Sequence, residues 1–249
     1  MTKNLNNCAL SSTIKSLQNS LDCIKKIANN HLERERLNYI ANNMEKCVAC
    51  LQEIKLGSNN VKNYFPESNE ELKKIILKDS IKLSEIDVSA LDDLSGVFKN
   101  SKRIDFAGIE NWDVSNVINM NRMFAGAIHF NQPLENWDVS NVTDMGYMFQ
   151  GAISFNQPLE KWDVSNVTNM EHMFAADEMA NDCRMIFNQP LSKWNISNVK
   201  NMFAMFFSNR CFNQPLDNWK ISQETNIKRM FEGSGQKPLP NWFTKKDTK

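Results

Sequence analysis

The sequence has no apolar run of about 18 residues, so it predicts no membrane span. It has no charge excess, because 29 Lys and Arg balance 29 Asp and Glu, and no positive field is left to hold a nucleic acid. Only 8 Gly and 7 Pro argue against a low-complexity or collagen-like chain. The first residues, MTKNLNNCALSSTIKSL, lack an apolar stretch of signal-peptide length. By sequence alone we therefore expect a cytoplasmic protein.

Catalytic motifs are also missing. No G-x-x-x-x-G-K-[ST], G-x-S-x-G or G-x-G-x-x-G pattern occurs, and no Ser/His/Asp set can be argued, so we expect no enzyme activity and no cofactor. Cys47 and Cys50 form a C-x-x-C without the second pair of ligands that a structural zinc site needs. We interpret them as core cysteines of a helix. A second group has no recognised ligand spacing, and we interpret it as a solvated loop rather than a metal site: His172, Asp177, Glu178, Asp182 and Cys183.

What the chain does contain is a repeat of 25 residues. Its unit reads F-N-Q-P-L-x-x-W-D-V-S-N-V-x-x-M-x-x-M-F. The tryptophans stand at Trp112, Trp137, Trp162, Trp194, Trp219 and Trp242. The FNQPL segments begin at Phe130, Phe155, Phe187 and Phe212. An insertion between Phe174 and Phe187 lengthens one spacing, and the copy that begins at Ile86 is divergent, as terminal copies of a stack are expected to be.

Read physically, one unit predicts a short strand, a bend, a short helical or second extended piece, and a turn. In LENWDVS, Leu134, Trp137 and Val139 stand among polar residues, which is typical of a strand. Val142, Met145, Met148 and Phe149 follow at helical or 3₁₀-like spacing. One unit cannot bury its own Trp, Met and Phe, but stacked units can, so we expect interior ladders of the Trp residues at 112–219 and of the four FNQPL phenylalanines.

Repeated polar residues are interpreted as parts of turns. Asn131, Asn156, Asn188 and Asn213 should form an amide ladder bonded to the turn backbone. Asp113, Asp138 and Asp163 recur at one place and become Asn195 and Lys220 in later units. A recurring column is a poor candidate for a catalytic carboxylate, so a capping or turn role is predicted for it.

Residues 1–57 differ from the repeats. Two stripes of apolar residues at steps of three and four, from Leu10 to Ala28 and from Leu37 to Ile54, predict a helical hairpin. The same stripes could form a dimer seam. We expect a linker and N-terminal cap at 58–80, with a helix start near SNEE, then repeats at 81–243 and a charged tail at 244–249.

The stretch FNQPLENWDVSNVTDMGYMF resembles the 25-residue repeat of BspA-like leucine-rich repeat surface proteins, which are common in mycoplasmas. The resemblance covers about 81–243. It implies a leucine-rich-repeat-type solenoid without enzyme activity, displayed on a surface and associated with adhesion or protein binding. The expected fold class is thus a repeat solenoid of short parallel strands and short helical segments, with an N-terminal helical hairpin.

Positions that differ between units are free to carry specificity. The pair after the first Met and the pair before each Trp both vary, and we expect one such stripe along the outside to bind a partner. Its candidate residues are Arg122, Tyr147, His172, Phe203 and Arg229. The alternative is that Tyr147 and Phe203 merely pad the surface. Three functions stay open: a protein-binding scaffold, a surface adhesin for host protein or glycan, and an intracellular partner of a toxin or effector system.

Overall fold

The computed structural model describes residues 15–22, 40–41, 44–45, 48, 62–176 and 185–243. The chain divides into two compact units, Met1–Asn63 and Tyr64–Lys249. In the first unit, residues 15–22 are helical, as are 40–41, 44–45 and 48. Leu21, Ala41 and Val48 are buried there. Most of the predicted hairpin at 1–57 and the predicted tail at 244–249 lie outside the described residues, so both stay predictions.

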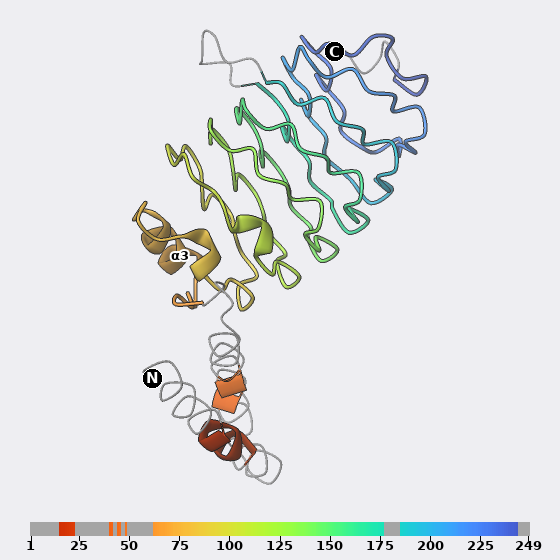
Figure 1. The fold of residues 1–249 in the computed structure, drawn as a ribbon. Helices are drawn as coiled ribbons and strands as arrows, with labels where there is room; N and C mark the ends of the chain where they lie inside the picture. The colour runs from red at the N-terminus through yellow and green to blue at the C-terminus, as the bar shows by residue number, and fades with distance from the viewer. Residues whose placement is uncertain are drawn as a thin grey trace. The chain divides into compact units, whose positions relative to one another are not determined.

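The second unit opens with α3 (Asn69–Ile76), labelled in Figure 1. Ser68 caps this helix, because its side chain accepts a hydrogen bond from the Glu71 N–H at 3.2 Å. Glu71 in turn accepts from the Glu67 N–H at 2.9 Å. Leu72 and Ile76 form the buried face of α3 and join the main hydrophobic core. The helix therefore covers one end of the repeat core with apolar side chains.

The Asn69 side chain adds a polar contact to this cover. Its Nδ2 donates to the carbonyl oxygens of Asp93 and Ser95, both at 3.1 Å. Those carbonyls lie in the first coil, on the side that faces α3. Two short 3₁₀ turns follow, η1 (Leu83–Glu85) and η2 (Ile109–Asn111).

Each later repeat forms one coil of turns, and successive coils lie side by side (Figure 1). Parallel hydrogen bonds join neighbouring coils. In the segment of each coil that contains the two Met residues and the Phe, every second backbone N–H donates to a carbonyl of the next coil. The Met120 N–H bonds the Asp144 carbonyl and the Phe124 N–H bonds the Met148 carbonyl, both at 2.9 Å. Isolated parallel bridges mark the same register and join Asp93, Asn119, Asp144, Asn169, Asn201 and Asn226 in succession. The coils are thus stacked at a shift of one repeat.

The predicted fold class, a leucine-rich-repeat solenoid of strands and short helices, is wrong. Within 62–176 and 185–243 the only pairing is by isolated bridges, and α3 is the one α-helix. The segment read as a strand is instead folded by turns, since the Trp137 N–H bonds the Leu134 carbonyl and the Val142 N–H bonds the Val139 carbonyl. Such turns, closed by a hydrogen bond to the carbonyl three residues earlier, interrupt the extended backbone that a β-strand requires.

The segment read as helical is not a helix either. The Met148 N–H does return to the Met145 carbonyl, but the Tyr147 and Phe149 N–H groups donate to the next coil instead. An α-helix would direct each of them to the carbonyl four residues back. Tyr147 also has φ 59°, in the left-handed region that ends regular helix or strand. The Met and Phe spacing reflects which side chains point inward in a turn-rich coil.

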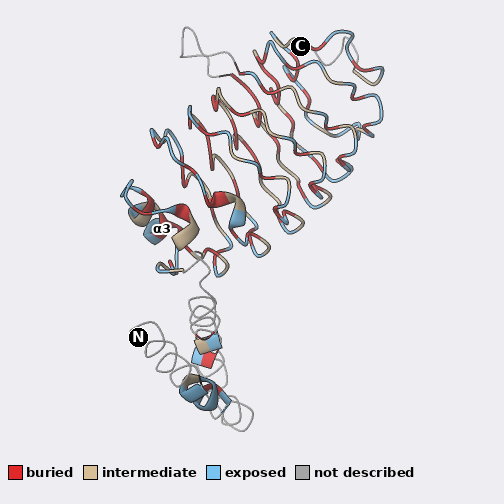
Figure 2. Cartoon of the chain, in the orientation of Figure 1, coloured by how far each residue is buried: buried red, intermediate tan, exposed pale blue. Residues whose placement is uncertain are grey.

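The interior of the coils is one continuous apolar core. The buried residues are red in Figure 2. Phenylalanine rings stack from coil to coil, with Phe124 and Phe149 at 5.6 Å and 8° and Phe149 and Phe174 at 5.7 Å and 6°. The FNQPL phenylalanines insert between them, so that Phe149 and Phe155 stack at 4.1 Å. All of these rings are fully buried. The stacked rings make each coil dependent on its neighbours for its core.

Candidate functional site: an outward row of side chains on successive coils

At one register of the repeat, five successive coils each have a residue other than glycine in the left-handed conformation. These residues are Arg122, Tyr147, His172, Ala204 and Arg229, with φ between 52° and 59°. Such angles are uncommon for residues other than glycine and are kept where the surroundings enforce them. Here the inter-coil bonds enforce them, since the Arg122 N–H donates to the Gly146 carbonyl and the Tyr147 N–H to the Glu171 carbonyl. The side chains therefore recur at one register and form a row.

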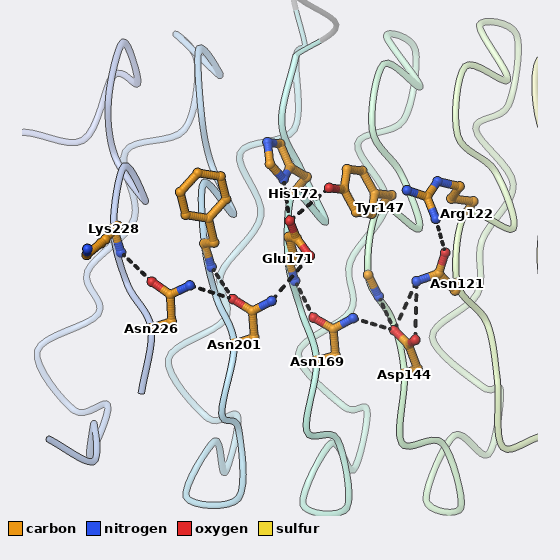
Figure 3. Close-up of polar contacts among 12 residues, drawn as sticks. Asn121, Arg122, Asp144, Tyr147, Asn169, Glu171, His172, Asn201, Asn226 and Lys228 are labelled. Carbon is orange, nitrogen blue, oxygen red and sulfur yellow. Dashed lines mark hydrogen bonds and ion pairs between the residues drawn. The ribbon is translucent and has the colours of Figure 1, made fainter. Parts of the chain in front are cut away.

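Four side chains form a continuous row of contacts, and Figure 3 labels three of them, Arg122, Tyr147 and His172. The guanidinium of Arg122 lies over the Tyr147 ring, 4.1 Å from its centroid. The Tyr147 and His172 rings are parallel at 4.7 Å and 7°. The His172 ring meets Phe203 at 5.3 Å and 54°. All four residues are of intermediate burial, so each keeps part of its surface exposed. We call Arg122, Tyr147, His172 and Phe203 the outward row.

Phe203 joins the row from a different register. Ala204, not Phe203, has the left-handed backbone of this coil. Phe203 instead packs on a small buried cluster of Ala175, Ala204 and Phe207. The fifth predicted residue, Arg229, has the left-handed backbone of this register and lies over Phe207, 4.5 Å from its ring centroid. Sequence reasoning missed Phe207, although the run M-F-F at 205–207 has one more aromatic residue than the other coils.

A second row of polar groups runs beside the first (Figure 3). The Asp144 carboxylate accepts from the Gly146 N–H at 2.8 Å, from Asn169 Nδ2 at 2.9 Å and from Asn121 Nδ2 at 3.2 Å. Sequence reasoning did not single out the Asn/Asp column of Asn119, Asp144, Asn169, Asn201 and Asn226, although INM, TDM, TNM, KNM and TNI carry it at fixed spacing. Asn121 and Glu171 stand two residues after members of this column. We call Asn121, Asp144, Asn169, Glu171, Asn201 and Asn226 the polar row.

Glu171 connects the two rows. Its Oε1 accepts from the Tyr147 hydroxyl at 2.8 Å and lies 3.6 Å from His172 Nδ1, while its Oε2 accepts from Asn201 Nδ2 at 3.2 Å. Burial raises the pKa of Tyr147, and the hydrogen bond to Glu171 and the carboxylate charge raise it further, while Arg122 opposes them. The Tyr147 hydroxyl is therefore held in its neutral, hydrogen-bonding form.

The predicted ladder residues lie inside or along the coils. The five tryptophans from Trp112 to Trp219 are at most 4 % exposed. Each indole N–H donates to a carbonyl of the preceding coil, for example Trp162 Nε1 to Leu134 at 2.8 Å and Trp194 Nε1 to Leu159 at 2.9 Å. Each tryptophan thus has both its ring buried and its polar atom paired.

The asparagine column forms hydrogen bonds from coil to coil. Asn131 Oδ1 accepts from the Asn156 N–H at 3.0 Å, and Asn156 Oδ1 accepts from the Asn188 N–H at 2.9 Å. Asn188 Oδ1 and Asn213 Oδ1 accept in the same way from the coils that follow them. Asp113, Asp138 and Asn195 each accept from the N–H two residues later, and Lys220 has no such oxygen.

Other candidates from the sequence contribute no assembled site. Cys47, Cys50 and the insertion residues 177–184 lie outside the described residues. Across the described parts of the chain, no three His, Cys, Asp or Glu side chains gather as metal ligands would. Of the helices described, none has both the length and the apolar character to cross a membrane.

The fold and the two rows define a repeat protein of stacked coils with a variable outward row. Its sequence matches the family model described as "Mycoplasma protein of unknown function, DUF285", over residues 59–186 and 177–249. The chain belongs to this family. No curated protein matches the chain, and no solved structure matches it.

Proposed function

We propose that this protein binds another protein through the outward row, without catalysis. The observation that supports the proposal is the continuous stack of Arg122, Tyr147, His172 and Phe203 over four successive coils. Tyrosine and arginine are enriched among residues that dominate binding energy. The row is held by backbone bonds and by Glu171, so little side-chain freedom would be lost on binding.

The stack favours a protein over a glycan at this row. A sugar normally packs on an open aromatic face. Here Arg122 covers the Tyr147 ring on one side and His172 lies parallel to it in the neighbouring coil. The row therefore offers ring edges, a guanidinium and a hydroxyl, which suit a mixed polar and apolar protein surface.

Display on the cell surface, with a role as an adhesin, is the second candidate. It is supported by the likeness of the FNQPL…MF unit to BspA-like surface proteins. The intracellular partner of a toxin or effector system stays a third interpretation. Fractionation of the native cells separates them, because an adhesin is found at the surface or in the medium.

Affinity capture tests the proposal. Wild-type protein and a Tyr147→Ala/Phe203→Ala variant are incubated with native lysate and medium, and bound proteins are identified by mass. We expect a partner that wild type retains and the variant loses. The matched control is Asn136→Ala/Asn218→Ala, which changes two exposed residues away from the row. If the row variant keeps its fold and captures every wild-type partner equally, the proposal is wrong.

A dimer through the N-terminal helices stays a prediction. The mass of the protein in solution, measured by light scattering on the full chain, tests it. A mass near 28.7 kDa at all concentrations would exclude a dimer.

A further inference from the structure

One coil breaks the pattern of the others at three neighbouring positions. The four coils that begin at Trp112, Trp137, Trp162 and Trp194 have Asp or Asn directly after the Trp, then Asn and Val at the fourth and fifth places after it. The coil that begins at Trp219 has Lys220, Gln223 and Glu224 at these places. The valines at this place, Val117, Val142, Val167 and Val199, are 0–2 % exposed. A glutamate carboxylate cannot take such a buried place without a partner. Glu224 is accordingly exposed.

The backbone shifts as a result. In the coils before it, the valine N–H closes a turn to the carbonyl three residues back, as in Val199 to Ile196 at 3.0 Å. In the divergent coil the turn is closed one residue later, by the Thr225 N–H on the Ser222 carbonyl at 3.1 Å. The Glu224 N–H bonds the Ser222 hydroxyl instead. Glu224 is thus exposed and does not take the buried place that valine has in the coils before it.

A groove of about 260 Å³ lies at this place, between two neighbouring coils. Polar and apolar atoms share its lining about equally, and the lining residues are Ser197, Asn198, Val199, Lys200, Ser222, Glu224 and Thr225. Pockets for drug-sized ligands begin at about 300 Å³, so the groove suits a ligand somewhat smaller than these.

One exposed carbonyl in the groove has no donor from the described residues, unlike its counterparts in the earlier coils. In each earlier coil pair, an asparagine amide donates to a serine carbonyl of the coil before: Asn116 to Ser89, Asn141 to Ser115, Asn166 to Ser140 and Asn198 to Ser165, at 2.7–2.9 Å. Ser197 is the next carbonyl in this series. Gln223 stands where the next asparagine would, and no described residue donates to the Ser197 carbonyl.

The charges on the rim add to this chemistry. Lys200 and Glu224 both line the groove and form no ion pair with each other. One can meet an anionic group and the other a cationic group of the same ligand. Tyr, Phe and Trp are absent from the lining, so the groove offers no platform for a sugar ring.

We propose that this groove binds a small polar ligand that carries a carboxamide and both signs of charge. The carboxamide takes the place of the missing asparagine and donates to the Ser197 carbonyl. Lys200 binds the ligand's carboxylate, and Glu224 binds its ammonium group. Free glutamine or asparagine has this chemistry, and so does a short peptide segment with an Asn or Gln beside charged residues.

Titration of the ¹⁵N-labelled full chain, followed by NMR, tests the groove. The two probes are L-glutamine and the capped peptide acetyl-Asp-Asn-Lys-amide, which separate a free amino acid from a peptide source. We expect saturable shifts at the amides of Ser197–Lys200 and Ser222–Thr225 with at least one probe. L-norvaline, which has the same zwitterion without a carboxamide, should bind ~5-fold more weakly, as loss of one hydrogen bond of about 1 kcal/mol predicts. Absence of saturable shifts with both probes, or equal binding of L-norvaline, would overturn the proposal.

A restored variant supplies the matched control. Gln223→Asn/Glu224→Val rebuilds the pattern of the earlier coils, so it should fold, close the groove and weaken probe binding at least ~10-fold. Unchanged binding by this variant would place the probe elsewhere. The Tyr147→Ala/Phe203→Ala variant should keep the groove shifts, so failure of the groove and failure of the outward row are distinguishable.

Discussion

The rings of Tyr147 and His172 lie parallel at 4.7 Å although 25 residues separate them in the chain. Their common left-handed backbone and the hydrogen bond from the Tyr147 N–H to the Glu171 carbonyl bring them to the same height in neighbouring coils. The Glu171 carboxylate then accepts from the Tyr147 hydroxyl and lies beside His172. The register of the backbone thus builds the outward row.

This arrangement predicts how Tyr147 titrates. Burial and Glu171 raise its pKa, so we expect its phenol to ionise above the usual value of about 10. Because the folded state favours the neutral phenol, the stabilising contribution is complete below pH ~10 and is lost as the pH rises through the folded pKa. Ultraviolet titration of wild type against Tyr147→Phe should show one late phenol missing in the variant. Glu171→Gln should move that phenol toward its ordinary pKa, and an unchanged titration would contradict the assigned cause.

The tryptophan column predicts a large loss of stability on truncation. Trp137 is 4 % exposed and its Nε1 donates to the Ile109 carbonyl. Trp137→Ala should reduce the free energy of unfolding by about 3–5 kcal/mol, through a cavity shared by adjacent coils. Urea unfolding followed by circular dichroism measures it. The neighbouring exposed Asn136→Ala should change stability by less than about 0.5 kcal/mol. A Trp137→Ala loss under about 1 kcal/mol would be incompatible with the buried column.

The asparagine column predicts a smaller loss of stability when one asparagine is replaced by alanine, and little loss when it is replaced by aspartate. Asn156→Ala removes the acceptor of the Asn188 N–H and of Gln189 Nε2. We expect a loss of about 1–3 kcal/mol, because a partly buried donor is left unpaired. Asn156→Asp keeps the Oδ1 acceptor and should recover most of the loss. Equal destabilisation by Ala and Asp, measured in the same urea assay, would show that the acceptor is not what matters.

Two glycines with positive φ form a further matched pair. Gly108 has φ 95°, and a Cβ there would lie 2.5 Å from the Ser84 backbone nitrogen, so Gly108→Ala adds a backbone clash to the conformational strain. Gly96 has φ 61°, but its Cβ would meet only side-chain atoms at 3.9 Å. We expect Gly96→Ala to cost about 1–2 kcal/mol and Gly108→Ala clearly more. Thermal unfolding of the two variants compares them, and the reverse order would refute the close approach of η2 to Ser84.

The sequence predicted which side chains are repeated but not the backbone that carries them. The period of 25 and its Trp, Phe and Asn columns were readable because stacked coils require equivalent residues at each level. The strand and helix predictions were wrong because the spacing of apolar residues indicates only which side chains point inward. It does not determine the backbone conformation between them. Left-handed residues such as Arg122 and Tyr147 give no sequence signal, since their conformation is imposed by inter-coil bonds.

The candidate site was predictable in part, because the repeat shows which positions vary from coil to coil. Variation at one register identified Arg122, Tyr147 and His172, but the shift between Phe203 and Ala204 needs the backbone angles. The groove needed the structure as well. Lys220 was noticed as an exception in its column, whereas the effect of Glu224 at a valine position depends on knowing that the valines are buried.

Asn69 has a consequence for how separate molecules meet. Its amide occupies the Asp93 and Ser95 carbonyls, which otherwise would accept bonds from any chain laid against that edge. Leu72 and Ile76 of α3 cover the apolar side chains next to them. A second molecule could not continue the array at this edge without displacing the helix. The helix therefore prevents the repeats of one molecule from stacking on the repeats of another, which would build a filament.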